Sequence, residues 1–300
     1  MKVFVTGATG YVGRPIAAAF RRAGHEVLGL ARDPAKARSL AAEEIRPVVG
    51  NLEDPGRFAQ AAATCEILVH AAADPGPSAF ELDRRTVETL LSAARREGKG
   101  RVLLYTSGTW VYGDTGGRAV DETAPVNPPG YAALRPRTER LVLEAGNVRG
   151  IVMRPGCVYG RQGSLTSMWF DGVGRGAIEV VGDGKARWAM VHQDDLADAY
   201  VRAAESGAAG EIFNLADGSA ESQADMARAA GRAAGYSREI RRVPVPDAVR
   251  RLGAWAECLS YDQRLDAGKA ERILGWKPRH SGFIPAAEIY YQSWKAARAS

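Results

Sequence analysis

A glycine-spaced loop at the start of the chain limits the folds that this sequence of 300 residues can adopt. The apolar run Lys2–Thr6 leads directly into Gly7, Gly10 and Gly13, and a helical run follows at Pro15–Arg22. A tight turn after a strand needs a residue that tolerates positive φ, which Gly7 supplies. At Gly10 the missing side chain lets a pyrophosphate approach the backbone, and N–H groups at the helix start bind the anion. We expect Gly13 to let the helix pack on the sheet, so the loop predicts a dinucleotide site although its spacing, G-x-x-G-x-x-G, differs from the general fingerprint.

Short apolar runs alternate with helical stretches over the first half of the chain. The predicted strands are Lys2–Thr6, Glu26–Leu30, Arg46–Val49, Ile67–Ala71, Val102–Thr106 and Ile151–Met153. The predicted helices cover residues 11–23, 55–63, 79–97 and 137–145. Continuous apolar strands are typical of a sheet that is covered on both faces. The alternation therefore predicts an α/β fold, a doubly wound parallel sheet of the Rossmann type.

The composition of the sequence changes after Arg154, where Gly, Trp and Pro become frequent. We therefore expect a dinucleotide-binding domain over residues 1–156 and mainly a smaller C-terminal substrate lobe over residues 157–300. Strand-like runs return at Ala189–Val191 and Glu211–Leu215, so residues 189–217 are expected to rejoin the first domain. Ligands of open α/β sheets bind beyond the carboxyl ends of the strands, where the small lobe would close a substrate pocket.

The end of the second predicted strand indicates which dinucleotide is bound. NAD enzymes hold the ribose 2′-hydroxyl with an acidic residue at this place, whereas an arginine accommodates the 2′-phosphate of NADP. Here the acid position is Ala31, and Arg32 follows it. Asp33, one residue later, leaves NAD as the alternative. Because a guanidinium pairs bidentately with a phosphate, the sequence favours NADP(H) over NAD.

Composition excludes several classes of function. The few cysteines and histidines are scattered without ligand spacing, which argues against a metal site and a disulfide framework. The net charge is +5, but no run of basic residues with interleaved aromatic residues points to nucleic acid. No signal peptide and no apolar run long enough for a membrane span is recognisable, so we expect a cytoplasmic protein.

Seven motifs follow one another in the order of a known family. They are VTGATGYVG at 5–13, LVHAAA at 68–73, YTSGTWVYG at 105–113, MRPGCVYG at 153–160, MVHQDDLADAY at 190–200, GEIFNLADG at 210–218 and ILGWKP at 273–278. With these motifs the chain resembles, over nearly its whole length, the extended short-chain dehydrogenases/reductases, a group of nucleotide-sugar epimerases, dehydratases and reductases. The resemblance implies a Rossmann domain with a C-terminal substrate lobe.

The resemblance also implies where the cofactor lies. It places the nicotinamide near Ala71–Ala73, Thr106–Ser107 and Pro155–Val158, and the adenine near Asn51 and Leu52, where such proteins more often have Asp. The cofactor-binding residues predicted from the loop, the strand end and the resemblance are Gly7, Thr9, Gly10, Tyr11, Val12, Gly13, Ala31, Arg32, Asn51, Leu52, Ala71, Ala72, Ala73, Thr106, Ser107, Tyr131, Arg135, Pro155 and Val158.

The catalytic pattern of the family is only partly kept. Its members carry a Ser or Thr before the V-Y-G motif and a Tyr-x-x-x-Lys, whose tyrosine exchanges a proton with the substrate and whose lysine lowers the pKa of that tyrosine. Here the tyrosine is Tyr131, the lysine is replaced by Arg135, and the hydroxyl position is Gly108, flanked by Ser107 and Thr109. We predict Tyr131 as proton donor, Arg135 as the cation, and Thr109 or Ser107 as hydrogen-bond donor to the carbonyl.

Pro136 adds a structural expectation to this departure. Proline is tolerated in the first turn of a helix and breaks its interior. The helix is therefore expected to start near Arg135, with Tyr131 in the preceding turn.

The substrate side of the pocket is less clearly marked. We predict substrate contacts at Gly108, Trp110, Tyr159 and Trp188. Three arginines of the lobe, Arg161, Arg175 and Arg187, are candidates for phosphate contacts and equally for surface charges. The recurring motif residues Tyr112, Tyr159, His192 and Asp195 are interpreted mainly as structural.

Three functions remain open from the sequence. The first is an NADP(H)-dependent oxidoreductase that acts on a small carbonyl or secondary alcohol. The second is a nucleotide-sugar epimerase or dehydratase. The third is a cofactor-binding regulatory or non-redox protein with degraded catalytic residues. A homodimer through the helices at 79–97 and 137–145 is also expected from the resemblance, on apolar residues such as Leu82, Val87, Leu90, Leu91, Leu141 and Val142.

Overall fold

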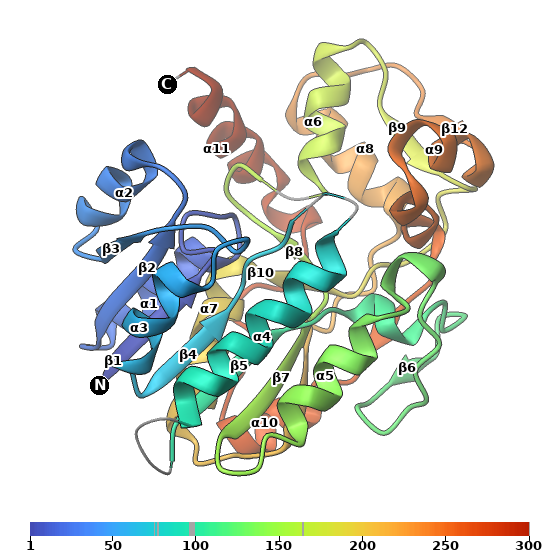
Figure 1. Ribbon diagram of the computed structural model, residues 1–300. Helices are drawn as coiled ribbons and strands as arrows, with labels where there is room; N and C mark the ends of the chain where they lie inside the picture. The colour runs from blue at the N-terminus through green and yellow to red at the C-terminus, as the bar shows by residue number, and fades with distance from the viewer. Residues whose placement is uncertain (75, 77, 96–99, 164, 300) are drawn as a thin grey trace.

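A parallel sheet of seven strands forms the centre of the molecule, as seen in the computed structural model (Figure 1), which describes residues 1–74, 76, 78–95, 100–163 and 165–299. The strand order is β11-β7-β5-β4-β1-β2-β3. The strands are β1 (Lys2–Thr6), β2 (Glu26–Ala31), β3 (Arg46–Val49), β4 (Ile67–His70), β5 (Val102–Thr106), β7 (Arg149–Pro155) and β11 (Glu211–Leu215). The order runs outward from β1 in both directions, so the sheet is doubly wound and the prediction of a Rossmann-type fold is confirmed.

Helices cover both faces of this sheet. One face carries α1 (Gly13–Arg22), α2 (Pro34–Ala41), α7 (Gln193–Glu205) and α10 (Gly268–Leu274), and the other carries α3 (Gly56–Ala63), α4 (Ala79–Arg95) and α5 (Arg135–Leu143). Successive strand residues alternate between the two cores, since Val3 and Val5 pack with α1 while Phe4 stacks on Phe58 of α3. The expected helices are present within a few residues of their predicted ends, and α2 is an additional one. Residues 96 and 97 of the third prediction lie outside the described residues.

The C-terminal lobe has its own aromatic core beside the sheet. Its helices are α6 (Ser167–Gly174), α8 (Gln223–Ala233), α9 (Val245–Leu252) and α11 (Ala287–Ala299), and its strands are β9 (Glu179–Val181) and β12 (Arg241–Val243). Two further short pairs are β8 (Cys157–Tyr159) with β10 (Met190–His192), and β6 (Ala119–Val120) with β13 (Arg264–Leu265). The 3-10 helices are η1 (Thr109–Tyr112), η2 (Gly130–Ala132), η3 (Ala254–Ser260) and η4 (Ile284–Ala286).

The chain crosses between sheet and lobe more often than the sequence indicates. The expected strand at 189–191 is β10, which pairs with β8 instead of joining the central sheet, whereas α7 and β11 do return to it. The tail also returns, because Ala270 and Leu274 of α10 and the nearby Trp276 are buried in the core on the α1 side. Local apolar patterns mark a strand but do not state which strand pairs with it.

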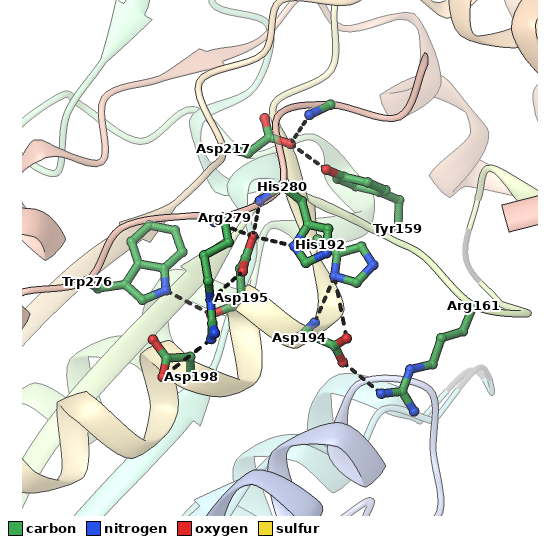
Figure 2. Close-up of polar contacts among 11 residues, drawn as sticks. Tyr159, Arg161, His192, Asp194, Asp195, Asp198, Asp217, Trp276, Arg279 and His280 are labelled. Atoms are coloured by element: carbon green, nitrogen blue, oxygen red, sulfur yellow. Dashed lines mark hydrogen bonds and ion pairs between the residues drawn. The ribbon is translucent and has the colours of Figure 1, made fainter. Parts of the chain in front are cut away.

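A polar network holds this returning tail (Figure 2). The Asp195 carboxylate, in the first turn of α7, accepts the backbone N–H groups of Arg279 at 3.0 Å and of His280 at 2.9 Å. The Trp276 indole donates to the backbone oxygen of Asp195 at 2.8 Å. Beside it, the Tyr159 hydroxyl donates to Asp217 at 2.9 Å. These contacts lie inside the protein, as expected for structural residues.

The helix pair expected at a dimer interface is occupied within the chain. Val87, Leu90 and Leu91 of α4 and Val142 of α5 are buried between these helices and the sheet, and Leu82 of α4 is also buried. Leu141 is 37% exposed. The apolar residues that supported a homodimer therefore stabilise the single chain, and the homodimer stays an untested prediction.

No helix in the described ranges is both long and apolar enough to cross a bilayer.

Candidate cofactor and substrate site

Two adjoining cavities open at the carboxyl ends of β1, β4 and β5. The first has a volume of about 440 Å³ and is lined by the glycine loop, Leu30, Arg32 and residues 51–53. The second has a volume of about 330 Å³ and is lined by Thr106–Trp110, Tyr131 and Arg135. Tyr11, Val12 and Ala71–Ala73 line both. The shared wall makes one continuous site, at the place where α/β sheets bind dinucleotides.

The glycine loop has the geometry of a phosphate cradle. Gly7 adopts φ +70°, and a Cβ there would meet the Ala71 backbone oxygen at 2.6 Å, so both conformation and space require glycine. At Gly10 a Cβ would meet the Gly7 oxygen alone, at 3.1 Å, which leaves the outer side of the loop open to a ligand. No side chain among the described residues caps the N-terminus of α1 at Val12. The N–H of Arg14 bonds the Gly10 backbone oxygen at 3.0 Å, whereas the N–H groups of Val12 and Gly13 have no backbone partner among the described residues and can bind an anion.

Gly13 is the first residue of α1 and lies against the backbone that directly follows β1. A Cβ at this residue would meet the Gly7 backbone oxygen at 2.2 Å and the Ala8 nitrogen at 3.2 Å. The missing side chain therefore lets the start of α1 lie close to the end of β1.

The far end of the first cavity carries the residues that were predicted to select the cofactor. Arg32 lines the cavity and is exposed, and none of the described residues forms an ion pair with its guanidinium. Asp33 instead caps α2, where its carboxylate accepts the N–H of Lys36 at 2.9 Å. Ala31 is buried in the core, so it provides backbone rather than a cavity surface. Asn51 also lines this end, where its side-chain oxygen accepts the N–H of Asp54 at 2.9 Å.

The wall of the second cavity contains the predicted nicotinamide-side residues. Ala71–Ala73, Thr106, Ser107, Pro155 and Val158 all line it. The Thr106 hydroxyl bonds the Tyr200 hydroxyl of α7 at 2.6 Å, which holds the end of β5 against the helix. The structure thus brings together the loop, the ends of three strands and the segment after β7, which the sequence spreads over more than 150 residues.

Tyr131 and Arg135 face the same cavity from two elements. Tyr131 lies in the turn η2, and α5 begins at Arg135 with Pro136 in its first turn, as predicted from the proline. The Tyr131 side chain is 38% exposed. Its ring packs edge-on against Phe80 and Trp110. The pair is therefore brought together by the turn and not by successive turns of one helix.

A buried chain of polar groups lies behind Arg135. Its guanidinium donates to the Thr106 backbone oxygen at 3.2 Å and to the Tyr105 hydroxyl at 3.4 Å. Tyr105 donates to Asp83 of α4 at 2.6 Å, and His70 Nε2 lies 3.2 Å from the other oxygen of that carboxylate. Thr6 bonds the second ring nitrogen of His70 at 2.7 Å. These hydrogen bonds anchor Arg135, the one cation among the described residues of the cavity wall, to three strands and two helices.

The charges in this buried network favour an ionised Asp83 carboxylate near the Arg135 guanidinium. Burial alone would raise the pKa of Asp83, but contacts with His70 and the charge of Arg135 outweigh it and lower that pKa. Burial, and then the nearby Asp83 charge, raise the pKa of Tyr105 well above its ordinary value, so it remains a neutral donor. Asp83, Tyr105 and His70 were not predicted from the sequence. Tyr105 and His70 stand beside predicted site residues in two family motifs, which is the signal that could have found them.

The two candidate hydroxyl donors are engaged inside the protein. Ser107 donates to Glu139 of α5 at 2.5 Å, and Glu139 forms a buried two-bond ion pair with Arg154. The Thr109 hydroxyl points to the side-chain oxygen of Gln263 at 3.4 Å, and Gln263 donates back to the Thr109 backbone oxygen at 3.0 Å. Both line the cavity, but neither has its hydrogen free for a ligand in this arrangement.

The predicted substrate residues divide into two groups. Gly108 and Trp110 line the second cavity. Tyr159 and Trp188 lie in the core of the C-terminal lobe, where Trp188 stacks on Trp169 and its indole donates to the Leu259 backbone oxygen at 3.0 Å. The structure therefore corrects the substrate assignment of these two rings. Large aromatic side chains in this lobe form its hydrophobic core, and their apolar character alone does not tell core from pocket.

Comparisons with known proteins agree with this architecture. The profile of the NAD dependent epimerase/dehydratase family matches residues 3–216. The chain is 31% identical to a 3-diazoavenalumate denitrifying reductase of a Streptomyces species, with 93% of this chain and 97% of that protein covered. It is also 31% identical to a 4-hydroxy-2-methyl-3-oxo-4-farnesyl-3,4-dihydroquinoline-1-oxide ketoreductase of Stigmatella aurantiaca, over 73% of this chain and 69% of that protein. A UDP-glucose 4-epimerase of Thermotoga maritima, solved with UDP-glucose, has a TM-score of 0.85 at 20% identity and covers 99% of this chain and 100% of its own, which shows the shared fold.

Proposed function

The chain belongs to the NAD-dependent epimerase/dehydratase family, within the extended short-chain dehydrogenases/reductases, and on that premise we propose that it is an NADP(H)-dependent oxidoreductase acting on a carbonyl or secondary alcohol. One observation carries the proposal: Tyr131 and Arg135 line the same cavity as the nicotinamide-side residues, and this cavity continues into one that ends at Arg32. Two of the relatives at 31% identity are named as reductases, which supports this reaction class.

Arg32 supports a preference for NADP(H). Its guanidinium lies in the wall of the adenosine-side cavity, next to Asn51 and Leu52, and a 2′-phosphate is the group that it would pair with. Asp33, the acidic alternative, is used as the cap of α2. An acid that is already bound to a backbone N–H is less available to a ribose hydroxyl.

Tyr131 supports the proton-transfer role by its place. The bound nicotinamide would supply or accept the hydride. Tyr131 would bind the substrate oxygen and exchange a proton with it. The contacts of its ring with Phe80 and Trp110 keep the hydroxyl in place at the cavity. Arg135 would hold the wall beneath through the Thr106 backbone and Tyr105, and place a fixed positive charge close to the phenol. A charge fixed in a cavity of low polarity acts more strongly than one in water.

Cofactor titrations test the proposal directly. We expect the native protein to bind NADPH more tightly than NADH in isothermal titration calorimetry. Arg32→Ala should weaken NADPH by about tenfold to a hundredfold, which corresponds to a lost hydrogen bond to a charged group, and leave NADH nearly unchanged. The matched control is Arg38→Ala, an exposed arginine on the adjacent helix α2.

The outcome distinguishes a cofactor contact from a general surface effect. Equal affinities of the native protein for NADPH and NADH would refute the preference. An Arg32→Ala variant that loses both cofactors to the same extent would also refute it.

A further inference from the structure

We propose that the substrate carries its reacting carbonyl on an uncharged aromatic ring system; the inference rests on the proposed reductase function and names the substrate class of the same site. Four aromatic side chains from four elements form a row at the second cavity. Trp110 and Tyr131 line the cavity, with ring centroids 6.2 Å apart. Phe80 supports Tyr131 at 5.7 Å, and Trp255 stacks on Trp110 at 6.5 Å with an interplanar angle of 19°.

The row leaves aromatic surface available at the cavity. Trp110 and Trp255 are only half-buried, and Tyr131 is exposed. Aromatic rings attract one another in offset or edge-to-face arrangements at centroid distances of about 4.5–7 Å. A planar ligand ring that enters the cavity would extend a stack that the protein already holds in place.

The charges of the site argue against a diphosphate-bearing substrate. Among the described residues of the second cavity wall, Arg135 is the one charged side chain, and its guanidinium is engaged by Tyr105 and Thr106. A nucleotide sugar would bring two phosphate charges, which need several cations or N–H donors when they leave water.

The three arginines named above as candidates for phosphate contacts do not supply these cations. Arg187 forms a two-bond ion pair with Asp262. Arg161 pairs with Asp194, as Figure 2 shows. Arg175 is exposed at the end of α6. Neutralised or outward arginines do not form a phosphate clamp.

Gly108 enlarges the apolar part of the cavity. Its backbone is extended, with φ 177°, and a Cβ there would meet no atom of the described residues within 4 Å. The position that carries a hydroxyl in resembling proteins is therefore open space in this chain. Leu165 and Cys157 also line this cavity, and burial raises the pKa of that thiol, which keeps it uncharged. Space, low polarity and the aromatic row together fit a flat apolar ligand.

The test compares two ketones that differ in aromaticity. 2-Acetylnaphthalene, its fully saturated decalin analogue and UDP-glucose are titrated calorimetrically into protein saturated with oxidised cofactor, which cannot reduce the two ketones, so their binding is measured without turnover. We expect the aromatic ketone to bind about threefold to tenfold more tightly than the saturated one, and UDP-glucose to bind more weakly than both. Trp110→Leu, which keeps apolar volume but removes the ring, should abolish the aromatic preference, and Trp255→Leu should reduce it. Trp294→Leu changes a half-buried tryptophan of α11 outside the cavity and should leave the preference unchanged.

Each outcome decides for or against the substrate class. Equal affinities for the two ketones, tighter binding of UDP-glucose, no binding of the aromatic ketone, or an aromatic preference that survives Trp110→Leu would overturn it. NADPH oxidation is then measured separately with the same compounds. Oxidation of NADPH by both ketones at equal efficiency supports the reductase function but overturns the aromatic substrate class. Tight aromatic binding without any NADPH or NADH oxidation supports the class of ligand and overturns the reductase.

Discussion

The ion pair between Glu139 and Arg154 allows a prediction whose size follows from the structure. Both side chains are almost fully buried, at 3% and 4% exposure. Glu139 accepts from Arg154 Nε at 2.9 Å and Nη2 at 2.5 Å, and from Ser107 at 2.5 Å. Glu139→Gln keeps the shape of the side chain but removes the charge, and it turns one acceptor into a donor that faces a guanidinium.

The expected loss of stability is large for the change of one side-chain group. An isolated buried charge is strongly disfavoured, and removing one partner of a buried pair typically costs about 3–5 kcal/mol. Arg154 keeps one other contact, the Tyr112 hydroxyl at 2.8 Å. We therefore expect Glu139→Gln to lower the free energy of unfolding by about 3 kcal/mol or more.

Guanidinium chloride unfolding followed by circular dichroism measures this loss. Glu144→Gln, on the exposed end of the same helix, is the matched control and should change stability by less than about 0.5 kcal/mol. The double variant Glu139→Leu with Arg154→Met removes both charges and should recover most of the stability. A loss below about 1 kcal/mol for Glu139→Gln, the size of an exposed pair, would contradict the reasoning.

Three further predictions concern catalysis, cofactor binding and pH. Tyr131→Phe should lower kcat by about 10²–10⁴ while cofactor affinity is retained, and a variant within threefold of native would remove Tyr131 from the proton-transfer role. Gly10→Val should prevent cofactor binding, because its side chain would occupy the space of the pyrophosphate. The circular dichroism spectrum should stay native, since a Cβ there meets the Gly7 oxygen alone among the described residues, and undiminished binding would argue against the phosphate loop. Burial, and then the charge of the stacked His280, lower the pKa of His192 to about 4 despite the nearby Asp194 and Asp195. As the pH decreases, the unfolded chain therefore binds a proton at this residue before the folded protein does. The free energy of unfolding should be highest above about pH 6.5 and should fall as the pH decreases toward 4. His192→Asn keeps a cap for the N–H of Asp194 and should flatten this slope in pH-dependent unfolding, and an unchanged slope would refute the assignment.

Local sequence determined the frame of the protein and the phosphate loop. The strands follow from continuous apolar runs, and Gly7 follows from the positive φ that a turn after β1 requires. The first turn of α5 follows from Pro136, because a proline fits there and not in a helix interior. These features depend on neighbours within a few residues, so they can be read from the chain without knowing its fold.

Only the tertiary structure decided which polar groups remain available in the site. Ser107 is engaged because β5 and β7 are neighbours, which puts Glu139 and Arg154 beside it. Arg135 is anchored because β4, β5 and α4 bring Tyr105 and Asp83 behind it.

The assignment of aromatic residues also depended on long-range packing. Trp188 belongs to the core of the lobe, whereas Trp110 lines the cavity and is supported by Trp255, which is far away in the sequence. The same residue type serves both places, because burial against a distant segment and exposure to a cavity leave no difference in the local pattern. Strand order and the path of the returning tail set these contacts, and both are properties of the whole fold.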